Sequence, residues 1–265
     1  MKKCFTINHL RTPAEIKLYL EKLIKTNLYQ ACEIFYPYQL SMEGQKAYFD
    51  ALEDFLVIPN FEFILHLPFG PNNNLATTIN LNQTKKRLKE AIEFGERLKV
   101  KKLTLHSGEI MNDLLKEDAI KLSILNVQEL ADIVKPLKMT IMVENLIGMK
   151  ELCVSPNEVL SFLKEVNRPN VKFTFDCGHA NVAGYKDLSS FVLMLKKYLY
   201  HLHLSDNFGD EDAHSLLGSG SIDFFVFFKT LKNINYNQYY CVEVFHQGLD
   251  DLIQMAKLMD KWYLT

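Results

Sequence analysis

Short apolar runs alternate with longer amphipathic stretches from one end of the chain to the other. Apolar runs of this kind, rich in β-branched and aromatic residues, are typical of strands that are buried on both faces. The amphipathic stretches repeat their apolar residues on one side of a helix, as Leu81, Leu88 and Ile92 do. The pattern predicts strands at 4–8, 31–36, 61–67, 100–106, 139–144, 171–176, 199–204 and 239–244.

Helices are predicted between these strands, and several of their ends carry boundary residues. Thr12 precedes Pro13, and a hydroxyl cap followed by proline favours the start of a helix. Pro136 comes just after the fourth helix, where a proline cannot continue the helical hydrogen bonds. The predicted helices cover 13–25, 42–57, 81–98, 117–134, 156–166, 188–197, 224–231 and 249–262.

The alternation predicts the fold class. Eight strand–helix units in 265 residues, with no Pro/Gly/Ser-rich linker, are typical of a single (β/α)8 TIM barrel. We therefore expect an α/β protein in which residues 1–265 form one domain. A doubly wound open sheet also fits the alternation, but no glycine-rich fingerprint follows any predicted strand, which disfavours a nucleotide-binding version of it.

Composition and charge narrow the class of function. Hydrophobic residues make up 48% of the chain and charged residues 23%, as in globular proteins that bury a full core. The formal net charge is −2, so no overall positive field attracts nucleic acid or an anionic membrane. Basic residues cluster only briefly, at 85–87 and 99–102. Binding to DNA would need a local basic surface that this pattern does not predict.

The cysteines and the N-terminal sequence indicate the compartment. Five cysteines are scattered without CxxC spacing, and an odd, dispersed set argues against a disulfide framework. The N-terminal stretch MKKCFTINHL lacks the apolar core of a signal peptide. No apolar run approaches the ~20 residues that span a bilayer. We expect a cytoplasmic protein without membrane association, and the oligomeric state stays open.

Histidine and carboxylate side chains stand where the apolar strands end, in FILHLPF, LTLHSG, IMVEN, KFTFDCGH, HLHL and CVEV. These residues are His66, His106, Glu144, Asp176, His179, His203 and Glu243. In a TIM barrel the carboxyl ends of the strands form one mouth, where the catalytic residues gather. Imidazole nitrogens and carboxylate oxygens are the usual donors to a divalent metal. Six successive strands that each deliver such a residue therefore predict a metal site at this mouth.

The loop after the seventh strand adds two candidates, Asp212 and His214. A solvated acidic loop beside two core histidines is the alternative interpretation, because a lone histidine at a strand end is more often structural. Glu144 and Glu243 argue against this alternative interpretation, because both stand beside valines and a buried carboxylate needs a cationic partner. The turn at 218–220 offers backbone N–H groups that either hold a phosphate or hydroxyl group or form a plain turn.

At these residues the sequence resembles the xylose isomerase-like TIM-barrel superfamily. That superfamily holds sugar and sugar-phosphate isomerases and epimerases together with endonuclease IV-type AP endonucleases. The resemblance covers nearly the whole chain. The matching segments are HLPFGPNNNLA (66–76), LHSGE (105–109), VEN (143–145), FDCGHANVAG (175–184), HLHLSDNFGDEDAH (201–214), LGSGSIDF (217–224) and VEV (242–244).

The resemblance implies a set of metal ligands. In the isomerase and epimerase members, one divalent metal is held by residues that match Glu144, Asp176, His203 and Glu243. In the endonuclease IV members, a cluster of three zinc ions adds ligands that match His66, His106, His179, Asp212 and His214. The chain has a residue of ligand type at every position of the larger set. The expected cofactor is a divalent metal ion, zinc or manganese, with one to three ions per chain.

The two branches of the superfamily imply different chemistry. An isomerase or epimerase acts on a sugar or sugar phosphate through a metal-stabilised enediolate, and Glu144 and Glu243 would move the proton. An AP endonuclease hydrolyses the phosphodiester at an abasic site, and nucleic acid is a partner only in that case. The segments DCGHAN and PFGPNNNLA and the absence of a basic track favour the isomerase or epimerase. Two other functions remain possible from the sequence: another metal-dependent hydrolase or lyase, and a barrel that binds a ligand or partner without turning it over.

Overall fold

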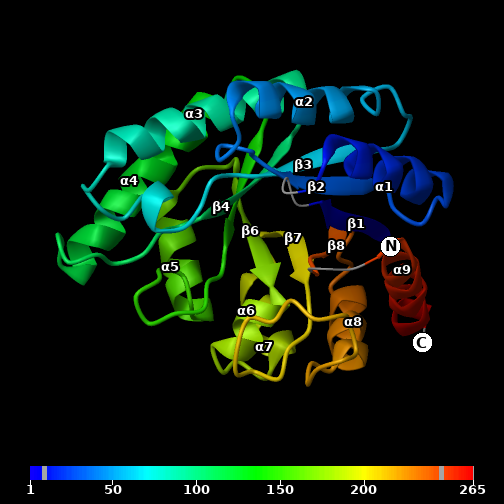
Figure 1. The fold of residues 1–265 in the computed structure, drawn as a ribbon. Coiled ribbons are helices and arrows are strands. Elements are labelled where there is room, and N and C mark those ends of the chain that lie inside the picture. Colours follow the sequence, from blue (N-terminus) through cyan, green and yellow to red (C-terminus); the bar gives the residue numbers. More distant parts are fainter. Residues whose placement is uncertain (8–10, 245–247, 265) are drawn as a thin grey trace.

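The structure is a computed structural model that describes residues 1–7, 11–244 and 248–264. Its parallel strands pair in sequence order and close into a barrel, because β1 pairs with both β2 and β8 (Figure 1). The strands are β1 (Lys2–Ile7), β2 (Ala31–Phe35), β3 (Glu62–His66), β4 (Lys102–His106), β5 (Thr140–Glu144), β6 (Val171–Asp176), β7 (Leu199–Leu204) and β8 (Tyr239–Val242). Closure confirms the predicted (β/α)8 TIM barrel and excludes an open doubly wound sheet.

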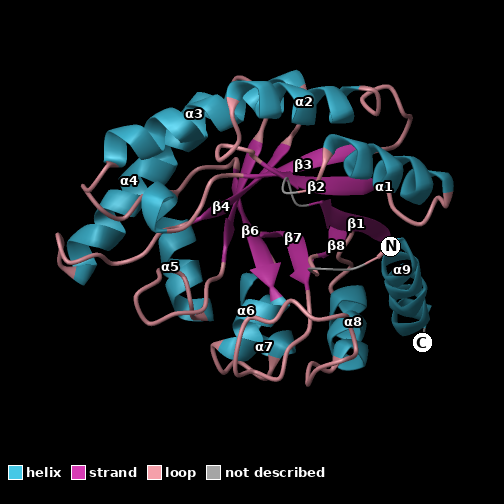
Figure 2. Ribbon diagram, viewed as in Figure 1, coloured by secondary structure: helices cyan, strands magenta, loops and turns pink. Residues whose placement is uncertain are grey.

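The helices lie around the outside of the strands (Figure 2). They are α1 (Pro13–Lys25), α2 (Met42–Glu53), α3 (Leu81–Arg97), α4 (Lys116–Val134), α5 (Pro156–Val166), α6 (Cys177–Val182), α7 (Leu188–Leu195), α8 (Phe224–Asn233) and α9 (Leu249–Leu264), with a 3-10 turn η1 (Pro71–Asn73). None of these described helices is both long and apolar enough to cross a membrane. Three predicted helices end earlier than expected, α2 at Glu53, α3 at Arg97 and α7 at Leu195. Asn8, the predicted end of the first strand, lies outside the described residues.

Capping residues fix the starts of the helices that flank the barrel. The Thr12 hydroxyl accepts a hydrogen bond from the Glu15 N–H at 3.2 Å, and the Glu15 carboxylate accepts one from the Thr12 N–H at 2.8 Å. Ser155 and Glu158 form the same reciprocal arrangement at the start of α5. Each arrangement satisfies N–H groups that the first helical turn leaves without partners.

Side chains of each strand alternate between the outer core and the barrel interior, because neighbouring residues of a strand point to opposite faces. On β7, Leu202 and Leu204 belong to the main hydrophobic core, whereas His201 and His203 contact polar side chains of other strands. A smaller apolar cluster occupies the interior and consists of Cys4, Ala31, Ile64, Met142, Tyr239 and Cys241. The apolar cluster and the inward-facing histidines thus share the interior, and the histidines lie toward the carboxyl ends of the strands.

Candidate metal centre

The predicted ligands lie at the carboxyl ends of the strands. Glu144 is the last residue of β5, Asp176 is the last residue of β6, and His203 is the penultimate residue of β7. Glu243 directly follows β8, and its N–H still donates to the Leu204 carbonyl at 2.9 Å, so it keeps the register of the barrel. The residues therefore reach one region because parallel strands of a barrel end at the same face.

Four of these side chains form one buried group: Glu144, Asp176, His203 and Glu243. Nδ1 of His203 lies 2.9 Å from Glu144 Oε1, 2.8 Å from Glu243 Oε2 and 3.8 Å from Asp176 Oδ2. Each residue comes from a different strand or strand end, and all four are at most 4% exposed. Three carboxylates facing one imidazole nitrogen form a donor set that suits a divalent cation.

The electrostatics of this group fit a bound cation. Burial opposes ionisation of Glu144, but the His203, His106 and His66 rings hold its pKa well below its usual range. Burial raises the pKa of Asp176 to about 7, opposed by His179 and reinforced by the neighbouring carboxylates. Among the described residues, Asp176 Oδ2 is buried without a hydrogen-bond partner. A buried carboxylate oxygen without a donor is destabilising, and a divalent ion would satisfy it.

His66 and His106 add a second group around the other oxygen of Glu144. Glu144 Oε2 lies 3.4 Å from His66 Nε2 and 3.1 Å from His106 Nε2, yet it makes no hydrogen bond among the described atoms. The Nδ1–H of His66 donates to the Leu67 carbonyl at 2.9 Å, which leaves a lone pair on Nε2 of the neutral ring. Lone pairs of nitrogen and oxygen that face each other fit a shared cation.

His179, Asp212 and His214 form a third group. Asp212 Oδ2 lies 3.4 Å from His179 Nε2 and 2.8 Å from His214 Nε2. The Nδ1 atoms of both rings lie against backbone carbonyls, His179 at 2.8 Å from Asn145 O and His214 at 2.9 Å from Glu243 O. These carbonyls orient the rings so that both Nε2 atoms face Asp212, as outer-shell partners of metal-binding histidines do. Burial lowers the pKa of His214, but Asp212 and Glu243 outweigh it and raise it to about 9.

The structure thus brings all nine predicted residues together in three adjoining groups. Glu144 belongs to two of them, and its Oε1 lies 3.6 Å from Nδ1 of His179 in the third. A family model described as xylose isomerase-like TIM barrel matches residues 23–262. The chain belongs to this family.

Individual relatives of this xylose isomerase-like barrel cover different parts of it. An uncharacterised protein of Methanocaldococcus jannaschii is 26% identical over 213 residues, which are 76% of this chain and 70% of that protein. A ketose 3-epimerase of Arthrobacter globiformis is 35% identical over 80 residues, 30% of this chain and 26% of the enzyme. The solved structure of a D-tagatose 3-epimerase-like protein has a TM-score of 0.83 at 24% identity and covers 99% of this chain and 97% of that one. This structural likeness shows the shared fold.

In this xylose isomerase-like barrel the turn at 218–220 holds a carboxylate of the chain itself. Oδ2 of Asp206 accepts hydrogen bonds from the N–H groups of Gly218 at 3.0 Å and Gly220 at 2.8 Å. Oδ1 accepts two more, from Asn207 at 2.9 Å and Ile222 at 3.2 Å. The turn is therefore a structural one, and it fixes the loop that carries Asp212 and His214 rather than offering its N–H groups to a ligand.

A cavity of about 380 Å³ opens over the three groups. Its lining includes the aromatic rings of Phe35 and Phe69 and the carboxylates of Glu109 and Glu151. Sequence reasoning assigned no role to these residues, although Phe69 and Glu109 each stand three positions after a predicted ligand. Glu33 was expected only as a residue that could line the pocket, without a defined role; it is absent from the cavity lining, and its carboxylate contacts two histidines inside the barrel. The one available signal was a glutamate within the apolar strand ACEIF.

Proposed function

We propose that the protein is a divalent-metal-dependent isomerase or epimerase of sugars. The observation that carries the proposal is the buried group in which Glu144, Asp176 and Glu243 surround one nitrogen of His203. The similarity to a ketose 3-epimerase supports the same class of reaction. These four residues would hold the ion, which supplies Lewis-acid polarisation of a substrate carbonyl when bound.

The two glutamates are the proposed proton-transfer residues. Glu144 and Glu243 reach His203 Nδ1 from β5 and from the end of β8, with oxygens at 2.9 and 2.8 Å. Carboxylates that approach one point from two strands can remove a proton from a carbon next to a carbonyl and return one on another side. Burial in the cavity keeps bulk water away from that carbon, which favours return of the proton over side reactions.

The rim of the cavity favours an uncharged sugar over a sugar phosphate. Glu109 and Glu151 both line it, and these two residues pair with each other in an isolated antiparallel β-bridge. Burial and the neighbouring Glu151 carboxylate raise the pKa of Glu109, and Lys150 opposes them. A phosphate dianion would meet repulsion there, whereas hydroxyl groups can donate to both carboxylates. A volume of about 380 Å³ is within the usual range for small-molecule sites.

Proton exchange tests the proposed reaction. Metal-loaded protein is incubated in D2O with free ketoses and with their phosphates, and NMR follows deuterium at the carbons next to the carbonyl. We expect exchange that needs the metal and a higher kcat/KM for the free sugar. Glu109→Gln should narrow the difference between the two substrates. Exchange with none of the sugars would refute the isomerase proposal.

Phosphodiester hydrolysis is the second candidate, and the three adjoining ligand groups favour it. The outer groups around His106 and Asp212 have the donors for two further ions. Elemental analysis of protein purified without chelator separates the two proposals. About one ion per chain supports the isomerase, whereas close to three zinc ions support cleavage of an abasic-site oligonucleotide. Protein that binds no metal even after reloading would contradict both.

A further inference from the structure

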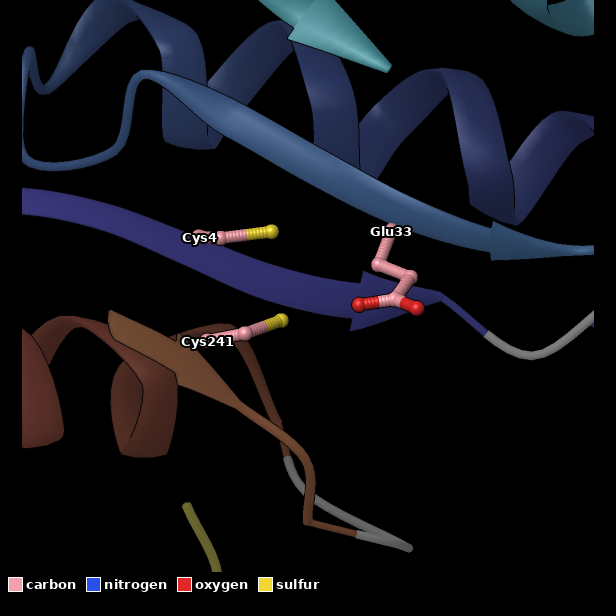
Figure 3. A group of neighbouring side chains, drawn as sticks. All are labelled: Cys4, Glu33 and Cys241. Carbon is pink, nitrogen blue, oxygen red and sulfur yellow. The ribbon is translucent and has the colours of Figure 1, made fainter. Parts of the chain in front are cut away.

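Glu33 is a carboxylate buried inside the barrel, below the metal ligands. It stands on β2 and is 0% exposed. Figure 3 shows its side chain near those of Cys4 and Cys241. Cys4 lies on β1, which pairs with β2, and Cys241 lies on β8, on the other side of β1. Burying a carboxylate is unfavourable by several kcal/mol unless partners satisfy it. The contacts of Glu33 therefore indicate what it does.

Both oxygens of Glu33 are occupied. Oε1 accepts a hydrogen bond from the Thr104 hydroxyl at 2.6 Å. Oε2 lies 2.7 Å from His201 Nε2 and 3.0 Å from His203 Nε2. Because Oε1 accepts from a hydroxyl and Oε2 faces two imidazole nitrogens, both oxygens act as acceptors, as those of a carboxylate do.

The thiols of Cys4 and Cys241, which lie close to Glu33, do not form a second metal site with its carboxylate. Sγ of Cys4, Sγ of Cys241 and a Glu33 oxygen lie within 4.8 Å of one another. A metal here would have to break the contact of the Cys4 thiol with the Phe5 carbonyl, whose oxygen lies 3.7 Å from Sγ. A metal here would also have to displace hydrogen-bond donors that already satisfy Glu33. The geometry directs Glu33 toward the histidines instead.

The position of Glu33 determines which nitrogen of His203 carries the proton. An ionised carboxylate only accepts hydrogen bonds, so the Nε2 atom that faces it must be protonated. In a neutral imidazole the other nitrogen then keeps its lone pair. That nitrogen is Nδ1, which faces the carboxylates of Glu144, Asp176 and Glu243.

We propose that Glu33 is a positioning residue that holds His203 as a metal ligand, by fixing its Nε2–H tautomer and its ring orientation from inside the barrel. The inference rests on the proposed metal-dependent function. His201 shares the same oxygen through its own Nε2, and its Nδ1 has no hydrogen-bond partner among the described residues. The ring of His201 therefore helps to fix the Glu33 carboxylate.

The test measures metal binding and the His203 tautomer without any sugar. Zinc affinity is obtained by competition with a fluorescent chelator, and long-range 1H–15N correlation spectra show which imidazole nitrogen is protonated. In the zinc-loaded wild-type protein we expect a proton on Nε2 of His203. Glu33→Gln should weaken zinc binding by about 10- to 100-fold, the usual effect of losing an outer-shell partner of a metal ligand. Thr104→Val is the matched control, because it removes a contact to Oε1 and leaves both histidine contacts in place; its zinc affinity should stay near that of the wild type.

The outcomes separate this inference from the proposed function. An unprotonated Nε2 in the wild-type protein would overturn the inference even if Glu33→Gln does not fold. Equal zinc affinity in wild type and Glu33→Gln would also overturn it, whatever the catalytic activity. Weaker zinc binding in Glu33→Gln with no turnover of any sugar by the wild type would support the positioning role and contradict the isomerase proposal. Wild-type protein that binds no zinc would contradict both.

Discussion

At the scale of single residues, Glu144 connects the parts of the centre. Its Oε1 lies 2.9 Å from His203 in the four-ligand group, and its Oε2 lies 3.1 Å from His106 in the second group. One carboxylate thus contributes to two candidate ion positions and is also a proposed proton carrier. Replacing it separates catalysis from folding, because glutamine has nearly the same shape but cannot accept a proton.

Glu144→Gln should lose turnover by at least about 100-fold, since general acid–base groups contribute about 10²- to 10⁴-fold. The fold should persist, because glutamine keeps the shape and volume of the glutamate side chain. Steady-state kinetics on the substrate and far-UV circular dichroism measure the two effects. Glu93→Gln, an exposed change on α3, serves as the control. A near wild-type rate in Glu144→Gln would show that Glu144 does not move the proton.

His214 tests whether the outer ligands are accessory. It contacts Asp212 at 2.8 Å and belongs to the third group, whereas the four-ligand group does not include it. His214→Ala should therefore remove at most the accessory ions, as measured by elemental analysis, and keep the ion of the four-ligand group. Complete loss of metal from this variant would mean that the primary ligands are wrongly assigned.

At the scale of elements, α5 shows how local sequence sets a boundary. Ser155 caps the helix, Pro156 opens it, and Glu158 accepts hydrogen bonds from the N–H groups of Val154 at 3.2 Å and Ser155 at 3.0 Å. Burial opposes ionisation of Glu158, but these N–H groups and Lys116 outweigh it and lower its pKa. The stabilisation it provides is therefore present in full above the unfolded pKa and disappears as the pH falls through the folded one.

Glu158→Gln should consequently be less stable than the wild type at neutral pH, by up to about 1 kcal/mol, as is typical for a negative charge in the first turn of a helix. The difference should shrink as the pH falls below about 4.5, where the carboxyl group of the unfolded chain takes up a proton. Urea unfolding at a series of pH values measures it. Glu165→Gln, on the same helix but away from its first turn, is the control. A difference that is independent of pH would rule out the charge of Glu158 as its cause.

At the scale of the whole molecule, the candidate metal centre connects the strands of the second half of the barrel with one another. The four-ligand group takes one residue each from β5, β6 and β7 and one from the end of β8. β8 in turn pairs with β1 and closes the barrel. An ion in this group would bind the folded chain and not the unfolded one, because only folding brings the four strands together.

Metal removal should therefore lower the melting temperature. At a free metal concentration of 100 times the Kd, binding to the folded state alone adds about 2.7 kcal/mol. For a chain of this size that corresponds to a rise in Tm of about 5 to 10 °C. Calorimetry of chelated and reloaded protein measures the shift, with His214→Ala as a variant that should keep most of it. Identical melting curves would indicate that no ion binds at the four-ligand group.

Much of this arrangement was predictable because it follows from short-range patterns. Glu144 and Asp176 directly end apolar runs, so their place at the carboxyl ends of β5 and β6 could be predicted. The short helix α6 could not, because Cys177–Val182 is too brief to show a helical repeat, and its cap is Asp176 itself. The contact between Glu33 and His201 joins residues 168 positions apart, and no local pattern carries that information.

The sequence by itself determined the alternation of strands and helices and the residue types at the strand ends, because both depend on the period of each element. It also determined that alternate residues of β7 point the same way, so that His201 and His203 share one face. Only the tertiary structure decided that the sheet closes, that Glu144 is shared by two ligand groups, and that Asp206 occupies the turn at 218–220. These features depend on contacts between residues far apart in the chain, which form only when the barrel closes.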